Sequence, residues 1–123
     1  MAPARGIAAA GTMVLLVLTA GTAAAQVVGG RYRVEGTNPN GSHYRGAATI
    51  TPSSDTTCRI RWQVGAASVG ICMRVGKTLA AAYSLGGKVG LVLYAIQPDG
   101  ALKGVWTVAD QPGAGTETLI PIK

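Results

Sequence analysis

The sequence is poor in several residue types on which particular protein classes depend. It contains no phenylalanine, aromatic residues make up only 5% of the chain, and charged residues make up 13%. There are five acidic residues, one histidine and two cysteines. Two cysteines and one histidine are too few for an ordinary structural zinc site. We therefore expect no metal and no cofactor.

Catalytic motifs are absent from the sequence as well. The carboxylates are scattered along the chain, and three of the five occur in turns, where aspartate forms local hydrogen bonds. There is no phosphate-binding loop, nucleophile elbow or zinc motif. The single histidine, His43, follows a turn-rich loop with no cysteine or carboxylate nearby, which indicates a solvated loop residue. We expect that the protein is not an enzyme.

The N-terminal residues have the composition of a secretory signal peptide. A short basic segment at 1–5 precedes an apolar stretch at 7–20, and Ala23-Ala24-Ala25 resembles an A-x-A cleavage site. The apolar stretch is shorter than the roughly 20 residues of a membrane span. We therefore expect a signal peptide at 1–25, a mature domain at 26–123, a secreted or periplasmic location, and no membrane span after cleavage.

Helical periodicity is missing from Val28 onward, and turn residues recur about every 8 to 14 positions, which is typical of an all-β protein. Strands are predicted at 31–36, 44–51, 57–64, 68–75, 78–84, both arms of a hairpin at 88–109, and 115–122. The connections are too short for parallel crossovers, so the strands form an antiparallel meander. Closing eight strands removes both exposed edges and predicts an up-and-down barrel of the lipocalin or avidin kind. A two-sheet sandwich is the alternative.

The hairpin at 88–109 is the clearest structural feature in the sequence. Pro98-Asp99-Gly100 separates two apolar runs, and the glycine can adopt the positive φ that closes a three-residue loop. The predicted cross-strand pairs are Ile96 with Leu102, Tyr94 with Gly104, and Val92 with Trp106. An aromatic ring over a strand glycine is typical of strongly curved sheets.

The two cysteines, Cys58 and Cys72, fall in the predicted mature domain. Export to an oxidising compartment favours a disulfide between them, although two separate buried thiols are the alternative. Alternation places Cys58 on the inner face with Ile60, Trp62 and Val64. In the next strand, however, the large apolar residues Ile71, Met73 and Val75 are expected to face inward, which would put Cys72 outside unless Gly70 forms a bulge.

The mature domain is basic. Without Arg5, ten basic residues remain against five acidic ones, which gives a net charge of about +5. The arginines Arg31, Arg33, Arg59 and Arg61 alternate with inward residues and form a candidate binding surface for an anionic polysaccharide or an acidic protein patch outside the cytoplasm. Nucleic acid is not an expected partner. The alternative is that these arginines only solvate the outer face and discourage edge pairing.

The inward aromatic residues are the second candidate binding feature. Trp62, Tyr94 and Trp106, together with Tyr32 and Tyr83, either fill the barrel or line a cavity at one end. Filling is the simpler interpretation, because the rest of the core is rich in glycine and alanine.

The segments from Gly30 to Gly46 (GRYRVEGTNPNGSHYRG), 60–65 (IRWQVG), 104–106 (GVW) and 115–119 (GTETL) resemble small exported proteins of alphaproteobacteria. Some of these carry a fibronectin-binding label. The resemblance implies an exported barrel that acts as a binding or adhesion module for fibronectin or other matrix components, and it identifies no binding residues. Two alternatives stay open: a periplasmic inhibitor of a protease or lysozyme, and a carrier of one small apolar ligand.

Overall fold

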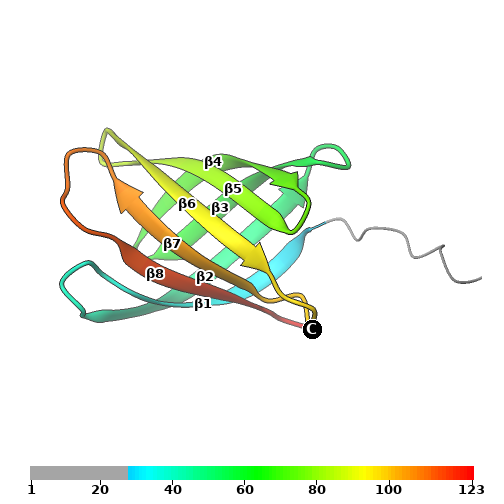
Figure 1. Ribbon diagram of the computed structural model, residues 1–123, viewed down its shortest axis with the longest axis horizontal. Coiled ribbons are helices and arrows are strands. Elements are labelled where there is room, and N and C mark those ends of the chain that lie inside the picture. The colour runs from blue at the N-terminus through cyan, green and yellow to red at the C-terminus, as the bar shows by residue number, and fades with distance from the viewer. Residues whose placement is uncertain (1–27) are drawn as a thin grey trace, which may run out of the picture.

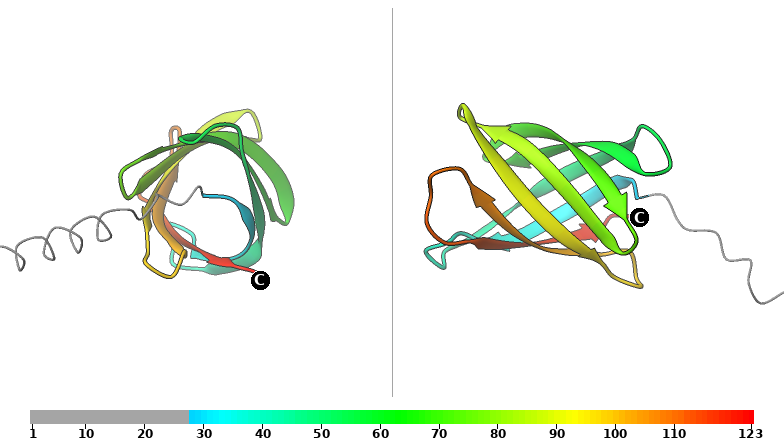
Figure 2. Two further views of the ribbon diagram at one scale, coloured as in Figure 1. Left: turned by 90° about the vertical axis from the view of Figure 1, so that its right-hand side faces the viewer. Right: turned by 45° about the horizontal axis from the view of Figure 1, so that its top comes forward.

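The computed structural model describes residues 28–123, which form a closed barrel of eight antiparallel strands in sequence order (Figure 1). The strands are β1 (Gly30–Thr37), β2 (His43–Pro52), β3 (Thr57–Val64), β4 (Ala66–Val75), β5 (Thr78–Leu85), β6 (Lys88–Ile96), β7 (Leu102–Val108) and β8 (Gly115–Pro121). β1 pairs with β8, so the sheet has no free edge, and the view along the barrel shows the closed ring (Figure 2). The predicted meander barrel is confirmed. The predicted signal peptide lies outside the described residues.

The strand bounds agree with the sequence prediction to within a residue or two, and the hairpin register agrees fully. The structure pairs Ile96 with Leu102, Tyr94 with Gly104, and Val92 with Trp106. The connecting turn is closed by a hydrogen bond of 2.8 Å from the Gln97 amide to the Ala101 carbonyl, and Gly100 has a φ of +90°. β4 begins at Ala66, two positions before the predicted start. Among the described residues, no helix is long and apolar enough to cross a membrane.

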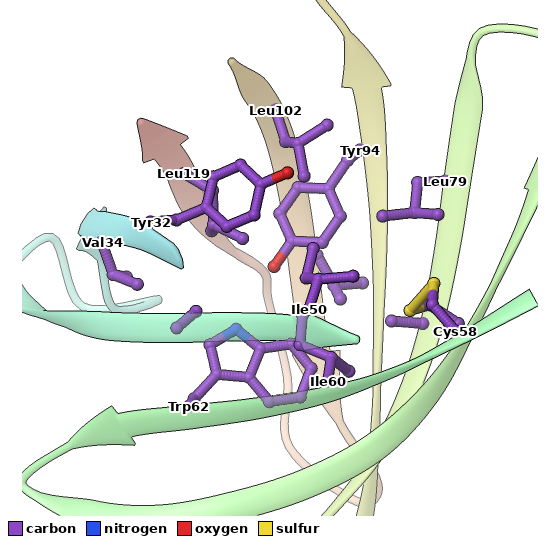
Figure 3. Close-up of a cluster of buried hydrophobic side chains, with 14 residues drawn as sticks. Tyr32, Val34, Ile50, Cys58, Ile60, Trp62, Leu79, Tyr94, Leu102 and Leu119 are labelled. Carbon is purple, nitrogen blue, oxygen red and sulfur yellow. A yellow bond between two sulfur atoms is a disulfide. The ribbon is translucent and has the colours of Figure 1, made fainter. Parts of the chain in front are cut away.

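One half of the barrel interior is filled by side chains (Figure 3). Val34, Leu79, Leu102 and Leu119 have no exposed surface, and the ring of Tyr94 is only 1% exposed. Each of the eight strands contributes at least one buried side chain to this cluster, because inward and outward positions alternate along a strand. This solid half lies at the end of the barrel where the β2–β3, β4–β5 and β6–β7 connections are found.

The prediction for β4 was wrong. Ile71, Met73 and Val75 face outward and are each more than half exposed, whereas Cys72 is buried, with 4% of its surface exposed. Cys72 lies directly opposite Cys58 in an uninterrupted register, and the two form a disulfide, so no bulge at Gly70 is needed. The predicted disulfide is confirmed, and its formation fixes the phase of the whole strand.

Because the large apolar residues of β4 face outward, the outer surface of the barrel carries an apolar patch that the sequence did not predict. Eight apolar side chains on β4, β6 and β7 are more than half exposed: Val69, Ile71, Met73, Val75, Val89, Leu91, Leu93 and Val105. They form continuous rows across the strands, since Met73 pairs with Ala80, Ala80 with Leu93, and Leu93 with Val105. Contiguous apolar patches of this kind are unusual on the outside of a soluble monomer. The opposite side of the barrel, β1–β3, carries arginines instead.

Candidate functional site: a cavity in the open half of the barrel

The other half of the barrel is hollow. A cavity of about 330 Å³ lies at the end where the β1–β2, β3–β4, β5–β6 and β7–β8 connections meet, on the left in Figure 1. Its lining comes from all eight strands or their connections: Asn38, Tyr44, Trp62, Val64, Ala66, Ser68, Tyr83, Leu85, Val92, Trp106 and Glu117. The barrel is therefore filled at one end and open at the other, so some of the inward aromatic residues fill the barrel and others line a cavity.

Four aromatic rings in the cavity wall are arranged as two edge-to-face pairs. Tyr44 and Trp106 have ring centroids 6.2 Å apart with an angle of 68° between the ring planes. Trp62 and Tyr83 have centroids 5.1 Å apart with an angle of 60°. Both geometries lie in the range that aromatic pairs prefer. The pairs hold the rings in fixed orientations around the empty space.

Glycines on neighbouring strands determine where three of these rings lie. Tyr44 lies over Gly36, Tyr83 over Gly90, and Trp106 over Gly115, and each ring is directly opposite its glycine in the strand register. A Cβ atom at any of the three glycines would overlap the ring. The small residue on one strand therefore creates the space for the ring on the next, as the sequence predicted for Tyr94 and Gly104 in the solid half.

Glu117, at the centre of β8, forms the floor of the cavity and is only 7% exposed. Its carboxylate accepts three hydrogen bonds from aromatic side chains. The Tyr44 hydroxyl donates to Oε1 over 2.9 Å, the Trp62 indole N–H donates to Oε2 over 3.0 Å, and the buried Tyr94 hydroxyl also donates to Oε2. In Figure 3 the Tyr94 hydroxyl lies on the side of the ring that faces Trp62. Glu117 thus connects the open half of the barrel to the solid half.

The hydroxyl groups around this carboxylate are poor acids. Burial, and then the negative charge of Glu117, raise the pKa of Tyr44 and Tyr94 well above the ordinary value, and the same two causes raise the pKa of Tyr83 to about 12. These tyrosines stay protonated at neutral pH and act as hydrogen-bond donors. No arginine, lysine or histidine is among the described residues that line the cavity.

The structure separates the predicted site residues into three places. Trp62 and Trp106 line the cavity, while Tyr94 is buried beneath it and contacts Glu117 through its hydroxyl. The arginines at positions 31, 33, 59 and 61 lie on the outside of the barrel, on β1 and β3, and none of them lines the cavity. The aromatic and arginine candidates therefore belong to two different surfaces.

The arginines form a basic outer face across β1, β2 and β3. Arg31 and Arg61 flank Thr49 in one row of the sheet, and Arg45 on β2 adds a fifth exposed cation. The one salt bridge found within residues 28–123 joins Arg33 to Glu35, with 3.0 Å between Nε and Oε2, and both side chains are exposed. This face can attract anions but holds no buried or convergent group that would specify one.

Two polar residues of the cavity, Tyr44 and Glu117, were not predicted as part of a site, whereas Tyr83 was among the inward aromatic residues expected to fill the barrel or line a cavity. The signal for Glu117 was present in the segment TETLIP, because a carboxylate two positions before the inward Leu119 must also face inward. A lone acidic residue at an interior position of a barrel is uncommon unless it is paired. Within the described part of the chain, no group of three or more His, Cys, Asp or Glu side chains could hold a metal ion.

No protein-family model and no curated protein matches the sequence. Among solved structures, the chain is similar to a redesigned β-barrel, b11L5F_LGL, with a TM-score of 0.67 and 21% sequence identity. The match covers 78% of this chain and 92% of the other. At this level of identity the similarity shows the barrel fold alone.

Proposed function

We propose that the protein binds one small organic molecule in the cavity at the open end of the barrel. The observation that carries this proposal is the combination of a preformed cavity of about 330 Å³ with a wall of four aromatic rings and one buried carboxylate. Ligand sites are typically apolar cavities of roughly 300–1,000 Å³ in which a few polar groups orient the ligand. Among the alternatives that the sequence left open, this favours the carrier of a small ligand.

The rest of the barrel is organised in a way that a binding site requires. All four rings are held by edge-to-face contacts and three of them also lie over a glycine, so little side-chain freedom is lost when a ligand enters. The solid half of the barrel supplies the packed core that an empty cavity does not contribute. A rigid and already open cavity supports binding of a ligand without rearrangement of the strands.

Tryptophan fluorescence tests the proposal directly, because both tryptophans of the chain, Trp62 and Trp106, line the cavity. A panel of small aromatic and aliphatic molecules should contain members that change the emission in a saturable way. Ser68→Leu, which adds a side chain inside the cavity opposite Trp62, should weaken binding of those members at least about tenfold by occupying their space. Ser84→Leu, the same change on the outer face of β5, should leave binding unchanged. Saturable binding that Ser68→Leu leaves intact, or a panel without any effect, would contradict the proposal.

A second candidate function rests on the basic outer face. We propose that the exposed arginines on β1–β3 bind an anionic polysaccharide or an acidic patch on a protein outside the cytoplasm. Charge-driven binding should weaken steeply as salt is added. Heparin affinity should fall in the Arg59→Gln/Arg61→Gln variant. The matched control, Lys88→Gln/Lys103→Gln on β6 and β7, loses the same charge and should keep its heparin affinity. Affinity that is equal at low and high salt would exclude this mode.

The proposed location is outside the cytoplasm. The Cys58–Cys72 disulfide supports an oxidising compartment. Export by the N-terminal residues, fibronectin binding, and inhibition of a protease or lysozyme stay predictions from the sequence. Measuring the free thiols of the protein recovered from its host would test the location, since a cytoplasmic protein would yield two thiols and an exported one none.

A further inference from the structure

Within residues 28–123, no positively charged side chain forms an ion pair with the buried carboxylate of Glu117. Its three hydrogen bonds come from two hydroxyls and an indole, all of them neutral donors. In residues 28–123 the one ion pair found is on the outer surface, between Arg33 and Glu35. Carboxylates are rarely buried this deeply without a cationic partner, because removing the charge from water is costly.

Glu117 also retains capacity for one further contact. A carboxylate has about four acceptor positions, and three of these positions are occupied. Oε2 takes two donors and Oε1 takes one, so Oε1 keeps an open position at the floor of the cavity. The negative charge is therefore accessible from the cavity, while the surrounding donors hold the carboxylate in place.

The walls above this carboxylate are suited to a cation as well. The faces and edges of Tyr44, Trp62, Tyr83 and Trp106 surround the space, and the lining contributes no basic side chain. Tryptophan and tyrosine rings attract a cation electrostatically when it lies within about 6 Å of the ring centroid, and desolvation strengthens the attraction. Aromatic cages of this composition recognise alkylated ammonium groups.

We propose that the ligand of the cavity is a small organic cation, with its ammonium group above Glu117 and among the four rings. This inference rests on the proposed function, since it names the chemical class of the molecule that the cavity binds. An anionic ligand would meet the charge of Glu117, and a neutral apolar ligand would leave that charge unbalanced. The alternative role for Glu117 is purely structural, as an anchor for Tyr94 and Trp62, and it predicts no preference between a cation and a neutral molecule of the same shape.

Isosteric ligand pairs distinguish these roles. Choline and 3,3-dimethylbutan-1-ol have the same shape and differ in the replacement of a quaternary nitrogen by carbon, and benzyltrimethylammonium and neopentylbenzene form a second pair. Affinities are measured by the quenching of Trp62 and Trp106 and checked by calorimetry. In at least one pair the cation should bind at least about tenfold more tightly than its neutral counterpart, because only the cation balances the charge of the buried Glu117 carboxylate in addition to contacting the rings.

Two variants with equal changes in net charge locate the origin of the preference. Glu117→Gln keeps the size of the side chain and removes the buried charge, and it should reduce the preference for the cation to less than about threefold. Glu35→Gln removes a charge from the outer face and should leave the preference unchanged, because exposed charges are screened by solvent. Near-ultraviolet circular dichroism establishes whether each variant keeps the packing of its aromatic rings.

The outcomes separate this inference from the proposed function. A preference for the cation that depends on Glu117 supports both proposals. Saturable binding of neutral molecules without a preference for the cation overturns the inference and leaves the proposed function in place. Absence of binding by both pairs and by the whole ligand panel overturns both. If Glu117→Gln does not fold, the comparison of isosteres in the unmodified protein still decides the question.

Discussion

Replacing Gly104 by alanine should destabilise the barrel, because the added Cβ atom would overlap the Tyr94 ring and the neighbouring backbone. A Cβ atom at this position would lie 2.5 Å from Cδ1 of Tyr94 and 2.9 Å from the carbonyl oxygen of Leu93. The Tyr94 ring is 1% exposed, and its hydroxyl donates a hydrogen bond to Glu117, so the ring cannot move aside without breaking a buried polar contact. The strain therefore falls on the packed half of the barrel.

The expected loss can be worked out from two opposing effects. Overpacking of a dense core by one methyl group costs about 1–3 kcal/mol. Alanine also restricts the unfolded chain, which returns about 0.4–1 kcal/mol. The net loss in the free energy of unfolding is therefore at most about 2.6 kcal/mol and is centred on about 1.3 kcal/mol, so the thermal midpoint of a domain of this size should fall by roughly 5–10 °C.

A double-mutant cycle with Tyr94→Leu tests whether the loss arises at the Tyr94 ring. If the methyl group acts by displacing the ring, then Gly104→Ala should cost much less once the ring has been removed, with a coupling of about 0.5–3 kcal/mol in urea unfolding. Lys103→Ala, at the exposed neighbouring position, is the control and should change stability by less than about 0.5 kcal/mol. Additive effects in the cycle, or an unchanged midpoint for Gly104→Ala, would refute the reasoning.

Three further predictions concern the disulfide, the outer face and the tyrosines. The Cys58→Ala/Cys72→Ala variant should lose about 3 kcal/mol of stability in urea unfolding, because the bond closes a loop with a sequence separation of 14; a reductant should destabilise the unmodified protein to the same extent and leave the variant unaffected. Leu79→Ala should lower the free energy of unfolding by about 2–5 kcal/mol, since this side chain is fully buried. Ile71→Ala on the outer face should lower it by less than about 1 kcal/mol. Equal losses in the two variants would contradict the assignment of the inner and outer faces. Because burial and then the charge of Glu117 raise the pKa of Tyr83 to about 12, the folded protein keeps a proton that the unfolded chain releases above pH 10, so stability should fall as the pH rises from 10 to 12. Ultraviolet titration near 295 nm should accordingly detect little tyrosinate in the folded protein at pH 10, and a full tyrosinate signal at that pH would contradict the buried positions of the rings.

Most of the fold could be predicted because local signals agreed with one another. Turn residues marked the ends of every strand, and the alternation in β1, β3 and the β6–β7 hairpin pointed to a single inner face. The position of Tyr94 over Gly104 followed from the register alone. Barrel closure followed from the absence of long connections, because an open meander of this length would expose two edges.

The prediction for β4 failed because it assumed that the larger apolar side chains face inward. In this strand the inner positions are taken by Ser68, Gly70 and Cys72, while the large apolar residues form part of the outer patch. The disulfide contained the information needed to correct the phase, since an inward Cys58 can bond only to a Cys72 that faces the same way. A covalent constraint should therefore outweigh side-chain hydrophobicity when a strand is assigned a face.

The candidate site could be predicted only in part, because its polar centre is a single residue without a motif. The tryptophans were identified from their inward alternation, but the hollow half could not be inferred, since the same pattern also describes a filled barrel. The space depends on which glycines lie opposite which rings, as with Gly90 and Tyr83, and on which inner positions are small. These are properties of the register across the whole ring of strands rather than of any one segment.

The inner face of β8 joins the stability of this barrel to its proposed binding site. Leu119, with no exposed surface, packs in the solid half, Glu117 forms the floor of the cavity, and Gly115 makes room for the Trp106 ring at the open end. Three alternate residues of one strand thus supply packing, charge and space in succession. The hydrogen bond from Tyr94 to Glu117 links the packed half of the barrel to the floor of the cavity. Burial of the unbalanced carboxylate therefore lowers the free energy of unfolding of the whole barrel. A cationic ligand would remove that cost, so ligand binding should raise the thermal midpoint of the protein as well as quench its tryptophans.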